Sequence, residues 1–248
     1  MIDVTFDFTS DSKGYWDGFL ERDILAGMSS VDPDKASATL KEYHRLLWSK
    51  ELPNGDRMEL ESRKPPYYLT WKDYCFGSDA IIVSFRYSRY KHIISQLNDM
   101  QSDPKQYWEQ LIRKAYTIGG AIIFPAHRSS MNQRRGMSKL VSDRWDLTLE
   151  CIRRYYSGEE SPLDSVIRSD KAFYDLFVDF KGYVDFFLLQ DAVSDDYSRV
   201  EIWEGNGSFE DDGLPKSLKE YLIFIDKEFA FLEKRNKRIK DYAIAHNL

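Results

Sequence analysis

The most apolar stretches of this chain are very short, AIIF at 121–124 and FFLL at 186–189. Neither approaches the roughly 20 apolar residues that a helix needs to cross a bilayer. We therefore expect no membrane span. The first stretch lies within TIGGAIIFP at 117–125, a β-branched run bounded by glycine and proline. Such a run is typical of a buried strand, so at least one strand is expected inside a folded core.

Composition and charge favour a folded cytoplasmic protein. Of 248 residues, 42% are hydrophobic and 15% are aromatic, which is too rich for a disordered chain. The net charge of -6 argues against a protein that coats nucleic acid non-specifically. Cys75 and Cys151 are the only cysteines, as expected in a reducing compartment. Asp3 and Asp7 stand where a signal peptide would carry basic residues.

Helical periodicity dominates the rest of the chain. Asp32 is a candidate N-cap for a helix over 32–48, with Pro33 at its first position. Further helices are expected in the second half of 80–98, over 104–116, over 138–156 and after Ser161-Pro162. Gly158 is expected to end the helix over 138–156. The range 171–193 is expected to form two short buried helices around Gly182, and 214–244 one long helix or a pair. Strands are expected at 4–8, at 57–61 after the turn 53–55, at 67–71, at 117–125 and near 200–203. The expected fold is α+β, a mostly helical single domain over 1–248 with a small β-sheet.

The segment that follows the strand at 117–125 is the candidate functional site. Residues 125–139 contain Arg128, Arg134, Arg135 and Lys139 and no carboxylate. Arginine binds phosphate or carboxylate through paired hydrogen bonds, and Ser130, Asn132 and Gln133 add neutral polar groups. The helix expected from 138 would add backbone N–H groups and its positive dipole end. This pattern predicts an anion-binding site, and the alternative is an ordinary solvated basic loop.

Acidic residues on the helix over 138–156 are the candidate catalytic groups. Asp143, Asp146, Glu150 and Arg153 share one helix face. Asp146 and Glu150 are the candidates for acid and base. The three carboxylates together could hold a divalent ion, or could clamp Arg128 or Arg134 and shape a pocket. An exposed charged face is the structural alternative. His127 is a candidate general base or phosphate contact. We assign no residue as a metal ligand, and no cofactor follows from the pattern.

Two other basic tracts lie at 85–92, where arginines alternate with tyrosines, and at 234–240, KRNKRIK. Arginine and tyrosine together can bind single-stranded nucleic acid, although an amphipathic segment with tyrosines at the core boundary is the favoured explanation of the first tract. Cations near a helix end complement its dipole and aid solubility, which explains the second. Among the aromatic residues of 171–193, Asp179 and Asp185 are candidate partners for the arginines at 128–135.

Four longer motifs carry a family resemblance: YHRLLWSKELPNG (43–55), IGGAIIFP and MNQRRG (within 118–136), DRWDLTLECIRRYY (143–156) and FKGYVDFFLLQD (180–191). The sequence resembles a bacterial domain-of-unknown-function family of conserved hypothetical proteins, over about residues 37–240. This resemblance implies a bacterial, intracellular protein and supplies no activity. The matched pattern includes Asn132, Gln133, Arg135, Gly136, Asp143, Arg144, Asp146 and Glu150.

Three functions follow as hypotheses. The first is a protein, with enzymatic activity an open question, that binds a nucleotide or another phosphate-bearing small molecule at 125–139. The second is a nucleic-acid-binding or nucleic-acid-cleaving protein of a mobile-element or defence locus, which requires the three basic tracts to form one surface. The third is a non-catalytic protein that binds a partner through aromatic residues. The sequence does not indicate an oligomeric state.

Overall fold

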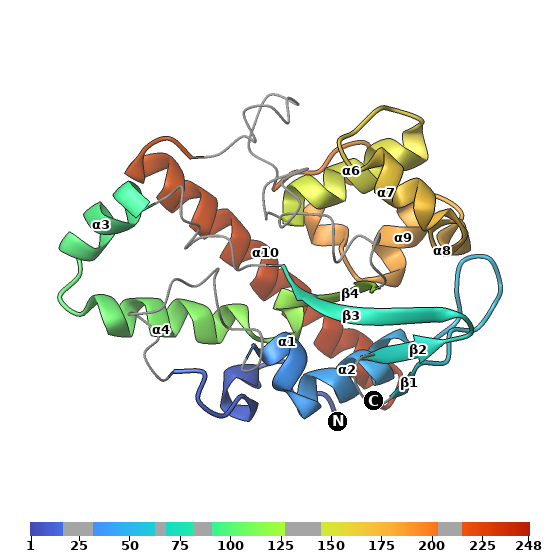
Figure 1. The fold of residues 1–248 in the computed structure, drawn as a ribbon, viewed down its shortest axis with the longest axis horizontal. Helices are drawn as coiled ribbons and strands as arrows, with labels where there is room; N and C mark the ends of the chain where they lie inside the picture. Colours follow the sequence, from blue (N-terminus) through green and yellow to red (C-terminus); the bar gives the residue numbers. More distant parts are fainter. Residues whose placement is uncertain (17–31, 63–67, 82–90, 127–144, 203–214) are drawn as a thin grey trace.

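The computed structural model describes residues 1–16, 32–62, 68–81, 91–126, 145–202 and 215–248 (Figure 1). The α-helices are α1 Pro33–Ala36, α2 Ala38–Trp48, α3 Lys91–Asp99, α4 Pro104–Ala115, α6 Trp145–Ser157, α7 Asp164–Ser169, α8 Lys171–Tyr174, α9 Phe180–Phe186 and α10 Leu218–Ala245. The strands are β1 Glu61–Ser62, β2 Leu69–Trp71, β3 Tyr74–Ala80 and β4 Ala121–Pro125, and short 3-10 helices are η1 Phe8–Asp11, η4 Ile118–Gly120, η6 Asp175–Phe177 and η7 Gln190–Ala192. The fold is therefore α+β and mostly helical with a small sheet, as predicted.

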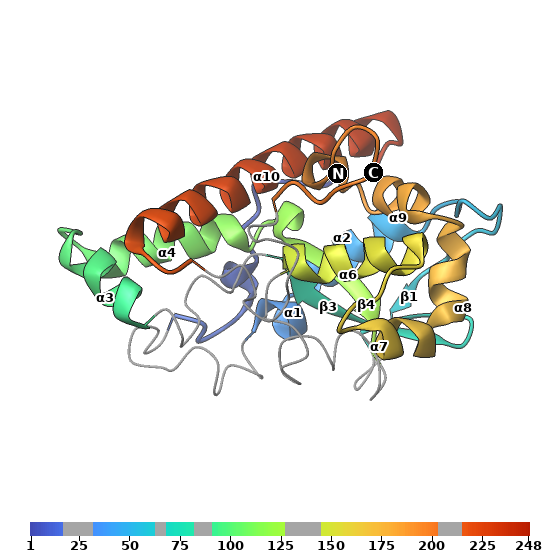
Figure 2. The same ribbon diagram turned by 90° about the horizontal axis from the view of Figure 1, so that it is seen from above.

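The long helix α10 organises the molecule. It runs from α3 at one end to the chain termini at the other, while α6 to α9 gather at the end opposite α3 and α4 (Figures 1 and 2). The amide of Ile2 donates to the carbonyl of Leu248 at 3.3 Å, so the two termini are adjacent. Buried side chains from η1 to α10 form one hydrophobic cluster. Among the described helices, none is both long and apolar enough to cross a membrane.

The sheet is antiparallel, with strand order β1-β2-β3-β4. In the β3–β4 pair, Ala80 lies opposite Ala121 and Phe76 opposite Pro125. All five residues of β4 are buried, which confirms the buried strand predicted within 117–125. The first part of that range forms η4 instead, because the chain turns there out of α4. The strand β3, which the sequence analysis did not anticipate, lies between β4 and the rest of the sheet.

Side chains of α10 cover the outer edge of β4, where backbone groups have no neighbouring strand. The guanidinium of Arg235 donates to the carbonyls of Gly119 and Ala121 at 2.7 and 2.9 Å and to Phe187 at 3.1 Å. Asn236 accepts from the amide of Gly119 at 2.7 Å. An uncovered strand edge invites pairing with other chains, and here Arg235 satisfies the carbonyl at the first residue of β4, Ala121. A Cβ at Gly119 would lie 2.6 Å from Asn236 Oδ1, so this approach requires glycine.

The prediction of a strand at 4–8 is wrong. This part of the chain turns and enters η1, with Asp7 as N-cap accepting from the amide of Thr9. The ring of Phe8 packs edge-on against Tyr43 at 5.7 Å between centroids. The apparent alternation of apolar residues therefore reflects aromatic packing around a capped turn, and no strand partner is present among the described residues.

The helix predicted over 32–48 is two helices. Asp32 is the N-cap of α1 and Pro33 its first residue, as predicted. The chain then leaves helical geometry at Ser37, whose hydroxyl caps α2 by accepting from the amide of Leu40 at 3.0 Å. The same hydroxyl donates to Asp11 at 2.8 Å. A contact with the distant η1 thus stabilises a break that local periodicity does not show.

The aromatic region 171–193 breaks at a different place from the one predicted. Gly182 lies inside α9, where a Cβ would be only 2.0 Å from the carbonyl oxygen of Phe177. It therefore permits close packing and does not end a helix. The break lies at Val178, which has φ of 69°, and Asp179 caps α9. A β-branched residue at positive φ is strained, and the side chain of Val178 is exposed there.

Most other predicted elements are confirmed within the described residues. The turn at 53–55 contains Gly55 at φ of 88°, and β2, α3, α4, α7 and α10 lie within or overlap the predicted ranges. Gly158 ends α6 at φ of 72°. Two strands are only partly confirmed. The range 57–61 forms an isolated bridge at Arg57 and joins β1 at its last residue, and Val200 forms a single bridge with Val193.

Candidate functional site

The predicted anion site lies between β4 and α6. Most of its residues lie outside the part of the chain that the structure describes, namely His127, Arg128, Ser130, Asn132, Gln133, Arg134, Arg135 and Asp143. Asp146 and Glu150 lie within it, on α6. The structure therefore shows the elements that flank the site and two of its carboxylates, and the assignment of the remaining residues stays a prediction.

Asp146 lies in the first turn of α6 and is fully buried. Its neighbour Trp145 stacks on Phe231 of α10, with the ring centroids 5.5 Å apart. This stacking anchors the start of α6 against the long helix. An ionised carboxylate is costly to bury unless it is paired, so the buried position of Asp146 is inconsistent with an ordinary exposed charged face.

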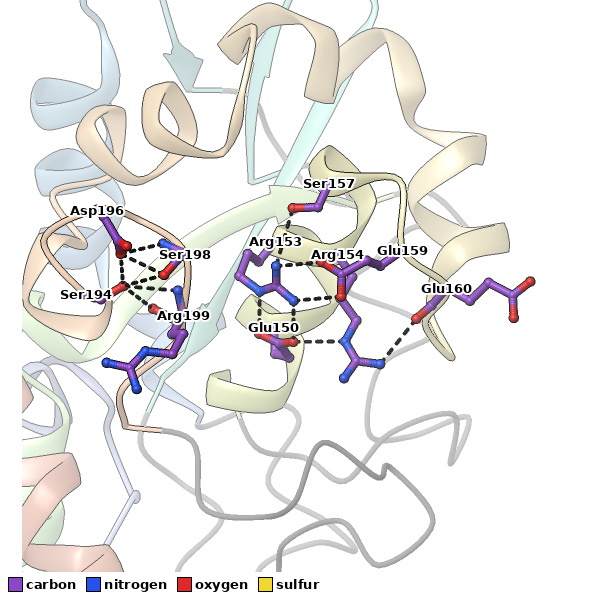
Figure 3. Close-up of polar contacts among 10 residues, drawn as sticks. All are labelled: Glu150, Arg153, Arg154, Ser157, Glu159, Glu160, Ser194, Asp196, Ser198 and Arg199. Carbon is purple, nitrogen blue, oxygen red and sulfur yellow. Dashed lines mark hydrogen bonds and ion pairs between the residues drawn. The ribbon is translucent and has the colours of Figure 1, made fainter.

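Glu150 is also buried, and its carboxylate is bound by two arginines (Figure 3). Arg153 donates from Nε to Oε2 and from Nη2 to Oε1, both at 2.9 Å. Arg154 donates from Nε to Oε1 at 2.8 Å. The guanidinium of Arg153 continues to Glu159 at 2.8 Å. Glu150 is therefore the centre of an ion-pair network along one side of α6.

This network affects what Glu150 can do chemically. The hydrogen bonds that Arg153 donates to Glu150 and Glu159 raise the pKa of Arg153, and the bond from Arg153 lowers the pKa of Glu159. A carboxylate offers about four acceptor positions, and three of those on Glu150 hold guanidinium N–H groups. Proton transfer by Glu150 would break an ion pair. The geometry suits a carboxylate that fixes the two arginines.

The two aspartates considered as partners of the arginines at 128–135 have other contacts. Asp179 accepts from the amide of Gly182 at 2.7 Å as the N-cap of α9. Asp185 accepts from Tyr197 and Gln190, each at 2.9 Å, and pairs with Lys181. Those contacts lower the pKa of Asp185 despite its partial burial. Pairing with the arginines stays a prediction.

The basic tract 234–240 is not a simple solvated surface. Arg235 is fully buried, and burial lowers its pKa to about 9. Arg238 pairs with Asp191 at 2.8 Å. The interpretation of this tract as solubilising charge is therefore wrong for Arg235. The sequence does contain a sign of this, because Arg235 falls between Leu232 and Ile239 on the apolar stripe of α10.

The sequence analysis also missed a cleft of about 820 Å³. Its lining comes from the end of α2, the turn that follows, α9 and the end of α10, and includes Lys50, Arg57, Lys181, Asp185, Tyr242 and His246. Lys50 Nζ lies over three aromatic rings, at 4.6 Å from the ring centres of Phe186 and Tyr242 and at 5.1 Å from that of Trp48. Burial, and then the positive charge of Arg235, lower the pKa of Lys50 to about 7. No sequence motif marks this site, because its members are far apart in the chain.

A buried polar chain links α2 to the sheet. Trp48 Nε1 donates to His44 Nδ1 at 2.9 Å, and His44 Nε2 lies 3.2 Å from Ser78 Oγ, which donates to Asp34 at 2.5 Å. Because Nδ1 accepts, Nε2 carries the proton and donates to Ser78. His44 therefore cannot take a proton from Ser78. This arrangement is structural and does not form a nucleophilic Ser-His pair.

A family model matches residues 2–239, and its description is a family of unknown function, DUF6994. The chain belongs to the DUF6994 family. No curated protein and no solved structure matches this chain. Membership in DUF6994 agrees with the resemblance to an uncharacterised family and covers nearly the whole chain.

The DUF6994 match includes the segment between β4 and α6, and also Lys50, Arg57 and Arg235. Tyr242 and His246, which complete the cleft, lie beyond the matched range. Within the described residues, no three histidine, cysteine or carboxylate side chains form a group that could hold a metal ion. Cys75 and Cys151 are both free thiols. The family name supplies no chemistry, so a function has to be argued from the residues.

Proposed function

We propose that this protein binds an anionic small molecule, a nucleotide or another phosphate-bearing compound, through the segment between β4 and α6. This segment carries Arg128, Arg134, Arg135 and Lys139 without a carboxylate from 125 to 139. Guanidinium groups bind phosphate oxygens in pairs. Ser130, Asn132 and Gln133 supply the neutral groups that would orient the ligand. A cytoplasmic location and a bacterial origin are part of this proposal.

The contacts of Glu150 carry the argument. Glu150 is one of the three carboxylates, with Asp143 and Asp146, that the sequence offered as a clamp for Arg128 or Arg134. Its oxygens already accept three hydrogen bonds from Arg153 and Arg154. Little acceptor capacity remains on it for a further arginine. This supports a basic segment whose positive charge is available to an external anion.

Catalysis on the bound compound is the finer part of the proposal. His127 would act as general base or phosphate contact. Asp143 and Asp146 are the first carboxylates that follow the basic segment 125–139 in the sequence. Asp146 is fully buried at the start of α6, and a buried carboxylate that faces a ligand is a candidate acid or base. Glu150 would act by holding Arg153 and Arg154 in place. Enzymatic activity requires its own test after binding.

Binding is tested by thermal unfolding with inorganic phosphate and a panel of nucleoside mono-, di- and triphosphates. A ligand that binds only the folded state raises the midpoint. We expect one class of phosphate compound to raise the midpoint by several degrees. The double substitution Arg134→Ala and Arg135→Ala should abolish that increase.

The matched control is Arg199→Ala, which removes a guanidinium that is 75% exposed and pairs with Glu201 at 3.4 Å. This control should retain the full ligand-dependent increase. The proposal fails when no compound in the panel raises the midpoint, or when the control loses the response to the same extent as the double variant.

The nucleic-acid alternative is weaker because the tract 234–240 contributes less charge than its sequence indicates. Arg235 is buried and Arg238 pairs with Asp191, so Lys234, Lys237 and Lys240 are its exposed cations. A protein that neutralises several phosphates binds with a steep salt dependence. Binding to a labelled oligonucleotide that falls steeply between low and physiological salt would favour this alternative over the small-molecule site.

A further inference from the structure

Lys50 is a half-buried amine enclosed by three elements. It follows α2 directly, and its carbonyl accepts from the amide of Met58 at 2.9 Å, which fixes the backbone. The rings of Trp48, Phe186 and Tyr242 surround Nζ. Within the described part of the chain, Nζ makes no hydrogen bond and no ion pair. The cleft is the direction from which a partner can reach it.

The charges around Lys50 favour a neutral amine. The permanently charged guanidinium of Arg235 acts on it from the interior, and Asp185, which would oppose this effect, is already bound to Lys181, Gln190 and Tyr197. The aromatic faces attract an ammonium group, but desolvation and the nearby cation outweigh them, and the pKa is about 7. Desolvation beside another cation is the arrangement that makes a lysine nucleophilic.

A second cation in the cleft is available to an acidic group of a ligand. Arg57 lines the same cleft, with its side chain 64% exposed, and its charge acts on the phenol of Tyr242. Its Nε pairs with Glu59 at 3.3 Å. Among the described residues its two terminal nitrogens make no hydrogen bond, so they can bind a carboxylate. Lys50 lies over the face of the same Tyr242 ring. Both groups therefore line the same cleft as Tyr242.

We infer that this cleft binds a small oxo-acid, an aldehyde or ketone that also bears a carboxylate, and that Lys50 forms an imine with its carbonyl. In the first step the Nζ lone pair forms a bond to the carbonyl carbon, and the C=O π pair moves to oxygen, which takes up a proton. The carbinolamine then loses that oxygen as water, and nitrogen gives up its remaining proton. The reaction is an amine plus a carbonyl compound giving an imine plus water, with no oxidant or reductant.

The test is chemical trapping on the full chain at pH 7. The probes are succinic semialdehyde, which has an aldehyde and a carboxylate, and butanal, which has the same chain length and no charge. Borohydride reduces each imine to a stable amine, and peptide mass spectrometry locates it. An ordinary lysine is neutral in roughly one molecule in 3,000 at pH 7, whereas an amine of pKa near 7 is neutral in about half. The lower basicity of Lys50 also makes its neutral amine less nucleophilic, which offsets part of the gain from its larger neutral fraction. We therefore expect at least about tenfold more adduct at Lys50 than at an exposed lysine.

Lys237 is the internal control, because its side chain is 80% exposed on α10 and lies outside the cleft. Equal labelling of Lys50 and Lys237 overturns the inference. This comparison is made within the unaltered protein and does not depend on a variant that folds. Lys50→Met should remove the dominant adduct, and Lys237→Met should leave it in place.

Arg57→Gln separates the amine from the acid-binding part of the site. We expect it to reduce labelling of Lys50 by succinic semialdehyde severalfold and to leave labelling by butanal unchanged. Equal reactivity of Lys50 towards both probes, with no effect of Arg57→Gln, overturns the oxo-acid as the ligand class.

Discussion

Lowering the pH from 7.5 to 5 should destabilise the fold through His44. This imidazole is fully buried, accepts from Trp48 at Nδ1 and donates from Nε2 to Ser78. Burial, and then the charge of Arg235, lower its pKa to about 3. In the unfolded chain the same group titrates near about 6.5. Between these two values the unfolded state binds a proton that the folded state does not.

The sign and size follow from proton linkage. When the unfolded state binds more protons, the free energy of unfolding rises with pH. The stabilisation from a neutral His44 is therefore complete above about pH 7 and is lost progressively as the pH falls below about 6.5. With a folded pKa of about 3, the loss between pH 7.5 and pH 5 is about 2 kcal/mol.

The assay is urea unfolding at both pH values, followed by tryptophan fluorescence and far-ultraviolet circular dichroism. Other groups titrate in this range, so the comparison is with His44→Gln, whose amide can still donate to Ser78 but does not titrate. We expect the wild-type protein to lose about 2 kcal/mol more than the variant between the two pH values. Equal losses in both proteins would refute the reasoning, because His44 would then have the same pKa in the folded and unfolded states.

Three further substitutions test the packing around the two sites. Glu150→Gln removes a buried carboxylate that accepts three hydrogen bonds from Arg153 and Arg154 and should lower the free energy of unfolding by about 2–4 kcal/mol, measured by urea unfolding at pH 7. Gly120→Ala would place a Cβ 1.9 Å from the carbonyl oxygen of Ala115, so we expect a loss of at least about 2 kcal/mol; an unchanged urea midpoint would contradict this. Lys50→Met should instead stabilise the protein at pH 7 by about 1–3 kcal/mol, because the folded state lowers the lysine pKa to about 7. This gain should be smaller at pH 9, where the wild-type amine is already neutral when folded, and a destabilised variant at pH 7 would show that the charged amine contributes favourably.

The elements that the sequence predicted well are those whose cause is local. The strand β4 follows from a run of β-branched residues, and α4 follows from the cap at Asp103, the proline beside it and an apolar stripe. The break at Ser37 could not be predicted in this way. It depends on a hydrogen bond to Asp11, and two segments that meet only after folding decide whether the helix continues.

The candidate site shows the same difference between features with a local cause and features that depend on long-range contacts. The predicted chemistry of 125–139 rests on a local concentration of arginines, which a single sequence shows directly. The contacts of Glu150 were only partly foreseeable, because spacing places Arg153 and Arg154 one turn away but does not show that the carboxylate is buried. The cleft at Lys50 was not predictable, since its walls come from α2, α9 and α10. Its only local sign is a lysine two residues after a tryptophan, Lys50 after Trp48.

Arg235 and Lys50 are two unusual cations that differ in their structural roles. Arg235 donates to three backbone carbonyls and covers the edge of β4, so its buried charge has a structural explanation. Lys50 has none within the described residues, because its amine lies over ring faces where a methionine would pack equally well. Removing much of the water around an amine costs stability, and functional sites are where proteins tolerate such a cost. The contrast with Arg235 therefore identifies Lys50, and not the more deeply buried arginine, as the cation whose position calls for a ligand.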